Sequence, residues 1–83
     1  MREDIKIKRQ IFRREFGERI KNLRDLNGIN RKDMAEYIGV CDSTLANWES
    51  GKSSPKINKL IKISNKFNVS IDYLIGLENK KPR

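Results

Sequence analysis

The chain has 83 residues, and its 19 lysines and arginines against 11 aspartates and glutamates give it a formal net charge of +8. It therefore forms at most one domain, and a polyanion is the partner that this charge favours. With one cysteine and no histidine, it has no internal disulfide, and zinc ligands and histidine-based catalysts are lacking. We expect no enzyme activity, no catalytic residue, no cofactor and no metal.

Residues 1–14 form a basic N-terminal extension, in which charge outweighs apolar side chains. Ile7 and Ile11 are four residues apart, which is helical spacing, but the apolar stripe is thin. The segment is therefore either a helix extension or a loosely ordered arm. Its arginines at positions 9, 13 and 14 either contact DNA or are simply solvated.

From Phe16 the apolar pattern becomes regular, and a first helix is predicted to end at Asn27-Gly28. Asn30 is the expected N-cap of a second helix over residues 31–38, which Gly39 ends. The residues expected to lie on the apolar face of the first helix are Phe16, Ile20, Leu23 and Leu26 or Asn27. In the second helix Met34, Ala35 and Ile38 are expected to face inward.

A third helix is predicted over residues 42–50, with Leu45 and Trp48 inward, Cys41 or Asp42 as the cap and Gly51 as the stop. Ser54-Pro55 is interpreted as the N-cap and first position of a fourth helix, which ends at Asn68. Its expected buried stripe is Ile57, Leu60, Ile61, Ser64 and Phe67. Ser70 caps a short fifth helix that Gly76 ends.

The predicted fold is therefore all-α, a compact bundle of five short helices with a basic N-terminal arm or helix extension. The domain spans residues 15–77, and residues 78–83 form a polar C-terminal tail. A tight turn through Gly39-Val40-Cys41 joins the second and third helices as in a helix-turn-helix, which places its second helix in the DNA major groove.

The chain over residues 16–77 resembles the lambda repressor/Cro-like helix-turn-helix family, also called the XRE family. The stretches that carry the resemblance are Phe16–Arg24, Asp33–Val40, Ser43–Lys52, Pro55 and Phe67–Leu74, with Trp48-Glu49-Ser50-Gly51-Lys52 at the centre.

The resemblance implies that residues 31–38 are the positioning helix and residues 42–50 the recognition helix. It implies base contacts by Asp42, Ser43, Thr44 and Asn47, and backbone contacts by Arg31, Lys32, Lys52, Ser53 and Lys56. Arg31 replaces the family's usual glutamine and suits a phosphate. Asn47 suits adenine. Arg24 and Glu49 match the family's internal ion pair.

Two residues depart from the family pattern. Asp42 is acidic where a neutral or basic residue is common, and it either caps its helix, which we favour, or accepts from a cytosine amino group. Cys41 replaces a small serine and is interpreted as a half-buried filler, with a thiol switch as the alternative.

Two functions remain open. The favoured one is a cytoplasmic, sequence-specific regulator of transcription in a prokaryotic cell or phage-infected host. It would bind double-stranded DNA as a homodimer at an inverted-repeat operator, as repressors of the phage or mobile-element type do. The alternative is an antitoxin-like module that neutralises a protein partner. No apolar run approaches the ~20 residues of a membrane span, and no membrane partner is expected.

Overall fold

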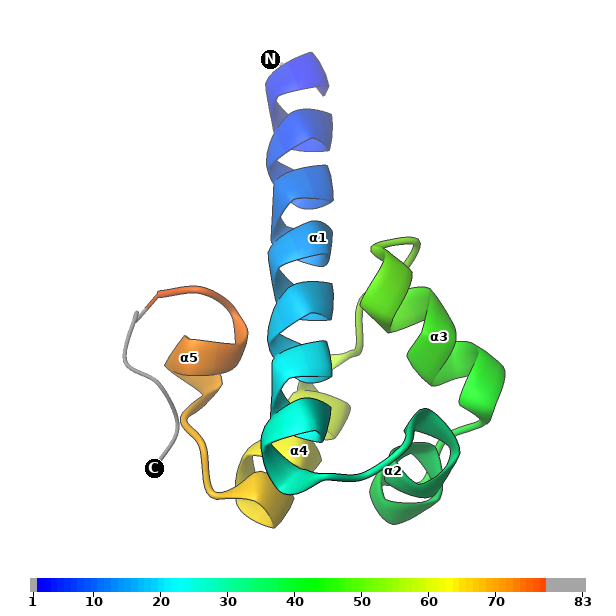
Figure 1. Cartoon of the computed structure of the whole chain (residues 1–83). Coiled ribbons are helices and arrows are strands. Elements are labelled where there is room, and N and C mark those ends of the chain that lie inside the picture. The colour runs from blue at the N-terminus through cyan, green and yellow to red at the C-terminus, as the bar shows by residue number, and fades with distance from the viewer. Residues whose placement is uncertain (1, 78–83) are drawn as a thin grey trace.

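The computed structural model describes residues 2–77, with side chains described from Lys8 onward, and this part of the chain forms five helices. They are α1 (Arg2–Asn27), α2 (Arg31–Ile38), α3 (Asp42–Ser50), α4 (Ile57–Phe67) and α5 (Ile71–Leu74). None of residues 2–77 belongs to a strand, which agrees with the predicted all-α class. In Figure 1, α1 is a central column with α2 and α3 on one side, α5 on the other and α4 behind its lower half.

The helix starts at α2 and α5 follow the predicted caps. The side-chain oxygen of Asn30 accepts a hydrogen bond from the backbone N–H of Asp33 at 2.8 Å. The hydroxyl of Ser70 accepts one from the N–H of Tyr73 at 3.0 Å. Each bond satisfies a backbone donor that the first helical turn leaves unpaired.

The helix-turn-helix turn depends on Gly39. This residue ends α2 with a φ of 90°, in the left-handed region where a side chain adds strain. Its N–H donates to the carbonyl of Ala35 at 2.8 Å, and the next N–H, from Val40, donates to the same carbonyl at 2.9 Å. The chain therefore reverses within three residues, and α3 begins at Asp42.

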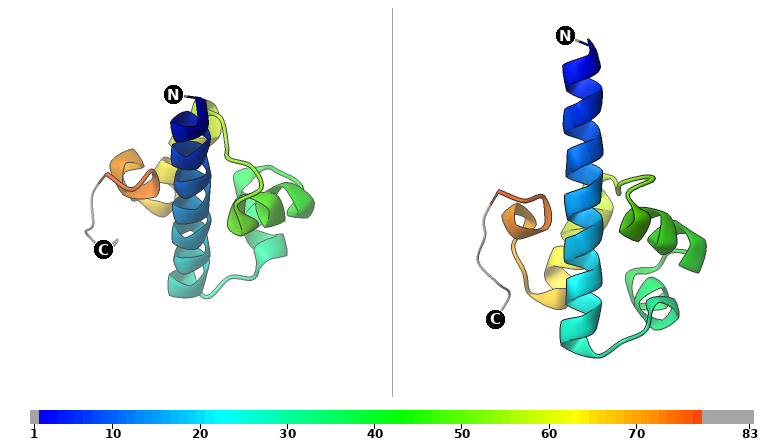
Figure 2. Two further views of the ribbon diagram at one scale, coloured as in Figure 1. Left: turned by 90° about the horizontal axis from the view of Figure 1, so that it is seen from above. Right: turned by 45° about the horizontal axis from the view of Figure 1, so that its top comes forward.

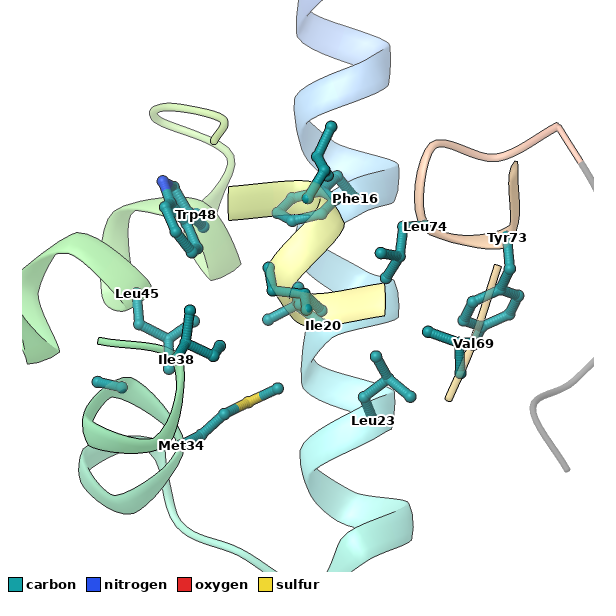
Figure 3. Packing of buried hydrophobic residues seen from close by; sticks show 13 residues of the cluster. Phe16, Ile20, Leu23, Met34, Ile38, Leu45, Trp48, Val69, Tyr73 and Leu74 are labelled. Atoms are coloured by element: carbon teal, nitrogen blue, oxygen red, sulfur yellow. The ribbon is translucent and has the colours of Figure 1, made fainter. Parts of the chain in front are cut away.

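One apolar cluster joins all five helices. Phe16 of α1 lies edge-on to Trp48 of α3, with ring centroids 6.2 Å apart. Trp48 is only 4% exposed, so it is a core residue. Figure 3 shows the side chains of the cluster gathered between α1, α2 and α3 and between α1 and α5. The buried members are Phe16, Ile20, Leu23, Met34, Ala35, Ile38, Leu45, Trp48, Leu60, Ile63, Val69, Tyr73 and Leu74. Leu26 and Asn27 are both exposed, so the predicted continuation of the apolar face of α1 beyond Leu23 was wrong.

The fourth helix differs from its prediction in start and in register. It begins at Ile57, after an N-cap at Lys56, so Ser54 and Pro55 lie in the preceding loop. Ile57 and Ile61, which were predicted to be buried, are 62% and 45% exposed. Leu60 is buried as predicted, and Ile63, which was not in the predicted stripe, is buried as well. Two apolar stripes of helical spacing exist in this segment, and contacts with α2 and α5 select the one that contains Ile63.

The N-terminal extension is helical. α1 is unbroken from Arg2 to Asn27 and runs through the predicted boundary between residues 14 and 15. At 1.5 Å per residue its 26 residues span about 39 Å, close to the 40 Å longest dimension of the molecule. The other four helices are short, as predicted. In Figures 1 and 2 the N-terminal part of α1 projects beyond the remaining helices. The predicted tail, residues 78–83, lies outside the described residues.

Candidate nucleic-acid interface

The outer face of α3 carries exposed polar side chains. Ser43 and Asn47 are four residues apart, so they share a face, and both are exposed. Leu45 and Trp48 occupy the opposite face and are buried. The side-chain amide of Asn47 makes no hydrogen bond within the described part of the chain, which leaves its donor and acceptor available. Thr44, at the edge of this face, is half-buried.

The dimensions of α3 suit a groove of duplex DNA. An α-helix with its side chains is about 10–12 Å in diameter, and the major groove of B-DNA, about 12 Å wide, admits such a helix. In Figure 1, α3 lies at the outside of the molecule, with α1 on its inner side. Its outer face is therefore presented to a partner without any rearrangement of the core.

The N-terminal ends of α2 and α3 are joined by an ion pair that the sequence analysis missed. Arg31 Nε donates to Asp42 Oδ1 at 3.0 Å, and Arg31 Nη2 donates to Asp42 Oδ2 at 3.3 Å. The side chains are 45% and 46% exposed. The hydrogen bond to Asp42 and the charge of that carboxylate raise the pKa of Arg31 above its usual value. Arg31 Nη1 makes no hydrogen bond within the described residues.

This pair corrects the prediction for Asp42. The N-cap of α3 is Cys41, which makes no side-chain capping bond, and Asp42 is the first helical residue. The carboxylate of Asp42 bonds Arg31 rather than a backbone N–H of α3. Opposite charges at the first positions of two helices joined by a tight turn are a signal that would have predicted the pair.

Cys41 also differs from expectation, because its side chain is exposed rather than half-buried. The fixed turn through Gly39 places it at the edge of the outer face of α3, immediately before Asp42.

A second ion pair ties α3 to α1. Arg24 Nε donates to Glu49 Oε2 at 2.6 Å, and Arg24 Nη2 donates to Glu49 Oε1 at 3.1 Å. The Glu49 side chain is 5% exposed and that of Arg24 is 17% exposed. The hydrogen bond to Glu49 raises the pKa of Arg24, against a smaller opposing effect of burial. This bidentate bridge fixes the rotation of α3 about its own axis.

The loop after α3 holds the other predicted backbone contacts. The N–H groups of Lys52 and Ser53 donate to the carbonyl of Asn47 at 2.9 and 3.3 Å, so the loop folds over the end of α3. Lys52 and Lys56 are exposed, and Ser53 is half-buried. At the opposite end of α3, Arg31 and Lys32 are exposed in the first turn of α2. Exposed basic residues therefore lie at both ends of the polar face.

The role of Gly17 was not predicted from the sequence. A Cβ at this position would lie 2.5 Å from the carbonyl oxygen of Trp48 and 2.6 Å from that of Glu49. These are backbone atoms of α3, so α1 and α3 approach closely only because Gly17 has no side chain. The available signal was a glycine inside a helical pattern. Such a glycine lowers helix stability relative to alanine, so its presence indicates a packing requirement.

Among residues 2–77, no helix combines the length and apolar character that crossing a membrane requires. No group of three or more potential metal ligands occurs in the described part of the chain.

Known proteins match the chain over this region. A family model described as a helix-turn-helix domain matches residues 17–80. The HTH-type transcriptional regulator ImmR of Bacillus subtilis (strain 168) is 38% identical over 61 residues, which cover 74% of this chain and 48% of ImmR. YonR, an SPbeta prophage-derived uncharacterized HTH-type transcriptional regulator of the same strain, is 37% identical over 60 residues, 72% of this chain and 56% of YonR. The chain thus spans about half the length of these relatives.

A solved structure supports the same assignment. The crystal structure of a transcriptional regulator from Listeria innocua superimposes with a TM-score of 0.71 at 33% identity, and the match covers 80% of this chain and 62% of that one. The family match includes α1 from Gly17 onward, the α2–α3 turn and α4. The chain therefore belongs to the helix-turn-helix domain family, which confirms the resemblance drawn from its sequence.

Proposed function

We propose that this protein is a sequence-specific regulator of transcription that binds double-stranded DNA through α3. The observation that carries the proposal is the outer face of α3, where the unpaired amide of Asn47 lies between two groups of exposed basic residues. Similarity to proteins named as transcriptional regulators supports it. The net charge of +8 suits a phosphate backbone. Binding, rather than catalysis, is the activity proposed.

The residues divide by role. Asn47 and Ser43 contact base edges in the major groove, and Thr44 adds a base contact from the edge of the same face. Asp42 contributes indirectly, by holding Arg31 through their ion pair. The backbone contacts are Arg31 and Lys32 at one end of α3 and Lys52, Ser53 and Lys56 at the other. Contacts of this second kind set the position of the protein without reading sequence.

A homodimer on an inverted repeat is the proposed binding form. Two copies of α3 would enter successive major grooves about 34 Å apart. Leu74 is fully buried and closes the core, whereas Leu77 is 74% exposed and is available for contact between protomers. Repression, of the kind found in phages and mobile elements, is the proposed outcome in a prokaryotic cytoplasm. Similarity to a prophage-derived regulator supports the phage or mobile-element setting.

A protein-neutralising role is less well supported. The feature that would favour this role is the acidic charge of Asp42 on the proposed DNA-binding face, because that charge repels phosphate. Pairing with Arg31 accounts for that charge, so the charge does not favour a protein partner over DNA.

The test is selection from a library of random duplexes at near-physiological salt. Enrichment of an inverted repeat is the expected result, because two symmetry-related copies of α3 would read two half-sites. Recovery of unselected sequences would contradict sequence-specific binding.

Variants then test the roles. Asn47→Ala is expected to weaken binding to the selected site by about 1–3 kcal/mol and to relax preference at one base pair. Arg31→Ala is expected to weaken selected and random duplexes alike and to reduce the salt dependence. Asn65→Ala, at an exposed asparagine on α4, is the matched control and is expected to bind like the wild type. Equal behaviour of the Asn47 and Arg31 variants on both duplexes would refute the assignment.

A further inference from the structure

The projecting part of α1 carries its basic residues on a defined face. Arg9 and Arg13 are four residues apart, and Gly17 follows after another four, so all three lie along one side of the helix. Gly17 faces the carbonyl oxygens of Trp48 and Glu49 in α3. The arginines therefore continue the face of α1 that packs against α3. In the sequence, positions 6 and 2 are also basic, three and seven residues before Arg9.

The acidic residues with described side chains that are nearest to this face, Glu15 and Glu18, lie on other faces of the helix. Glu15 pairs with Arg19 at 3.6 Å, one turn further along. Glu18 is adjacent to Gly17 and is rotated about 100° from it, where it is exposed. The face that contains Arg9 and Arg13 is thus positive without a neighbouring carboxylate among the residues with described side chains.

Arg13 connects this face to the loop at the end of α3. Its Nη1 donates to the carbonyl of Lys52 in a long hydrogen bond of 3.4 Å. Its Nε is buried and has no hydrogen-bond partner in the described part of the chain. The backbone of α1 is also close here, because a Cβ on Gly51 would lie 3.5 Å from the Cα of Arg14. The part of α1 that precedes Arg13 therefore projects from the point where α1 contacts the loop that carries Lys52.

Arg9 is exposed and lies beyond that loop. Four residues of helix place it about 6 Å further along α1 than Arg13, and the helix continues about 10 Å past it. Figure 1 shows this part of α1 rising past the end of α3 and the loop that follows it. A duplex seated on the outer face of α3 would be flanked at this end by the basic face of α1.

We infer that the projecting part of α1 is a second DNA-contacting surface, on which Arg9, with Arg13 behind it, binds the phosphate backbone outside the base pairs that α3 reads. The inference rests on the proposed function, because it requires a duplex held by α3. Contacts of this kind would lengthen the DNA site without adding sequence preference, since phosphate contacts carry no sequence information directly. The charge selects DNA as the occupant of this face. The most exposed apolar residue nearby, Ile11, lies on the other side of the helix and is 50% exposed.

The experiment compares two duplexes with the full chain. One carries only the selected site, and the other carries the same site with about ten further base pairs on each side, one turn of B-DNA. The variants are Arg9→Gln and, as the matched control, Lys8→Gln. Each removes one positive charge from adjacent exposed positions, but Lys8 is rotated about 100° away from Arg9.

The wild type is expected to bind the longer duplex more tightly. Arg9→Gln is expected to bind that duplex about three- to tenfold more weakly than the wild type near 0.1 M salt, with a salt dependence lower by about one counterion. It should match the wild type on the short duplex. Lys8→Gln should behave like the wild type on both.

Several results would overturn the inference. These are an Arg9→Gln variant equal to the wild type on the long duplex, equal losses in the Lys8 and Arg9 variants, or a change in self-association by sedimentation without a change in DNA binding. If no site is selected, a random-sequence duplex of 30 or so base pairs replaces the operator in the salt titration. If no site is selected but Arg9→Gln alone weakens binding to that duplex, the proposed sequence-specific binding is overturned and the inference about α1 stands. Absence of any duplex binding would overturn both.

Discussion

Replacement of Gly17 by alanine tests whether the close approach of α1 and α3 determines stability. The new Cβ would lie 2.5 and 2.6 Å from two carbonyl oxygens of α3. Because these are backbone atoms inside a helix, the helices must separate, and overpacking of this kind costs about 1–3 kcal/mol. Alanine recovers about 0.5–1 kcal/mol of helix propensity. The expected net loss is about 1–2 kcal/mol of unfolding free energy.

For a domain of this size, each 1 kcal/mol lowers Tm by about 4–8 °C. Thermal unfolding followed by circular dichroism should therefore show Gly17→Ala melting about 5–15 °C below the wild type. Asn22→Ala is the control, since Asn22 is exposed on the same helix and the change should only improve helix propensity. A Gly17→Ala variant as stable as the wild type, or more stable, would refute the packing argument.

Three further outcomes are expected. Arg24→Ala should lower the unfolding free energy in urea by about 2–4 kcal/mol, because it strands the nearly buried carboxylate of Glu49, and removal of both partners should cost less than the sum of the single changes. Ile63→Ala should cost about 2–5 kcal/mol in the same assay, whereas Ile61→Ala should change stability by less than about 0.5 kcal/mol; equal effects would contradict the register of α4. Asp42→Ala should tighten binding to random-sequence DNA and steepen the salt dependence of that binding by about one counterion, because the guanidinium of Arg31 is no longer neutralised. An unchanged slope of log affinity against log salt would show that the ion pair is already open in the complex.

The features that the sequence predicted well are local. Asn30 and Ser70 cap their helices through bonds that span three residues, and Gly39 reverses the chain within one turn. The inward faces of α2 and α3 follow from apolar residues three and four apart. Such signals need no knowledge of which helix packs on which, because the helix itself sets the spacing.

The features that were missed depend on contacts between helices. In α4, Ile57 and Ile61 are four residues apart, and Leu60 and Ile63 are three apart, so both pairs have helical spacing. Only packing against the neighbouring helices determines that Ile57 and Ile61 are exposed while Leu60 and Ile63 are buried. A Ser-Pro pair favours a helix start but also occurs in loops, as at Ser54.

The same limit applies to the candidate interface. The bond between Arg31 and Asp42 joins residues eleven positions apart on separate helices. A residue-by-residue comparison with a family assigns each of them a role alone and does not show that they neutralise each other. The placement of Asn47 on the outer face, by contrast, follows from the buried positions of Leu45 and Trp48 on the same helix.

The exposure of Cys41 gives the protein a built-in chemical reporter. It is the one cysteine in the printed sequence, and its thiol lies at the start of α3, beside the face proposed to enter the groove. Because a thiolate is the nucleophile in alkylation, a maleimide or iodoacetamide reagent would mark this position and no other thiol. Bound duplex should slow the reaction by covering the sulfur, so the alkylation rate measured by mass spectrometry becomes a footprint of DNA recorded on the protein. A fluorophore attached there would instead report arrival of the duplex as a change in emission, at a point fixed by the rigid turn that precedes it.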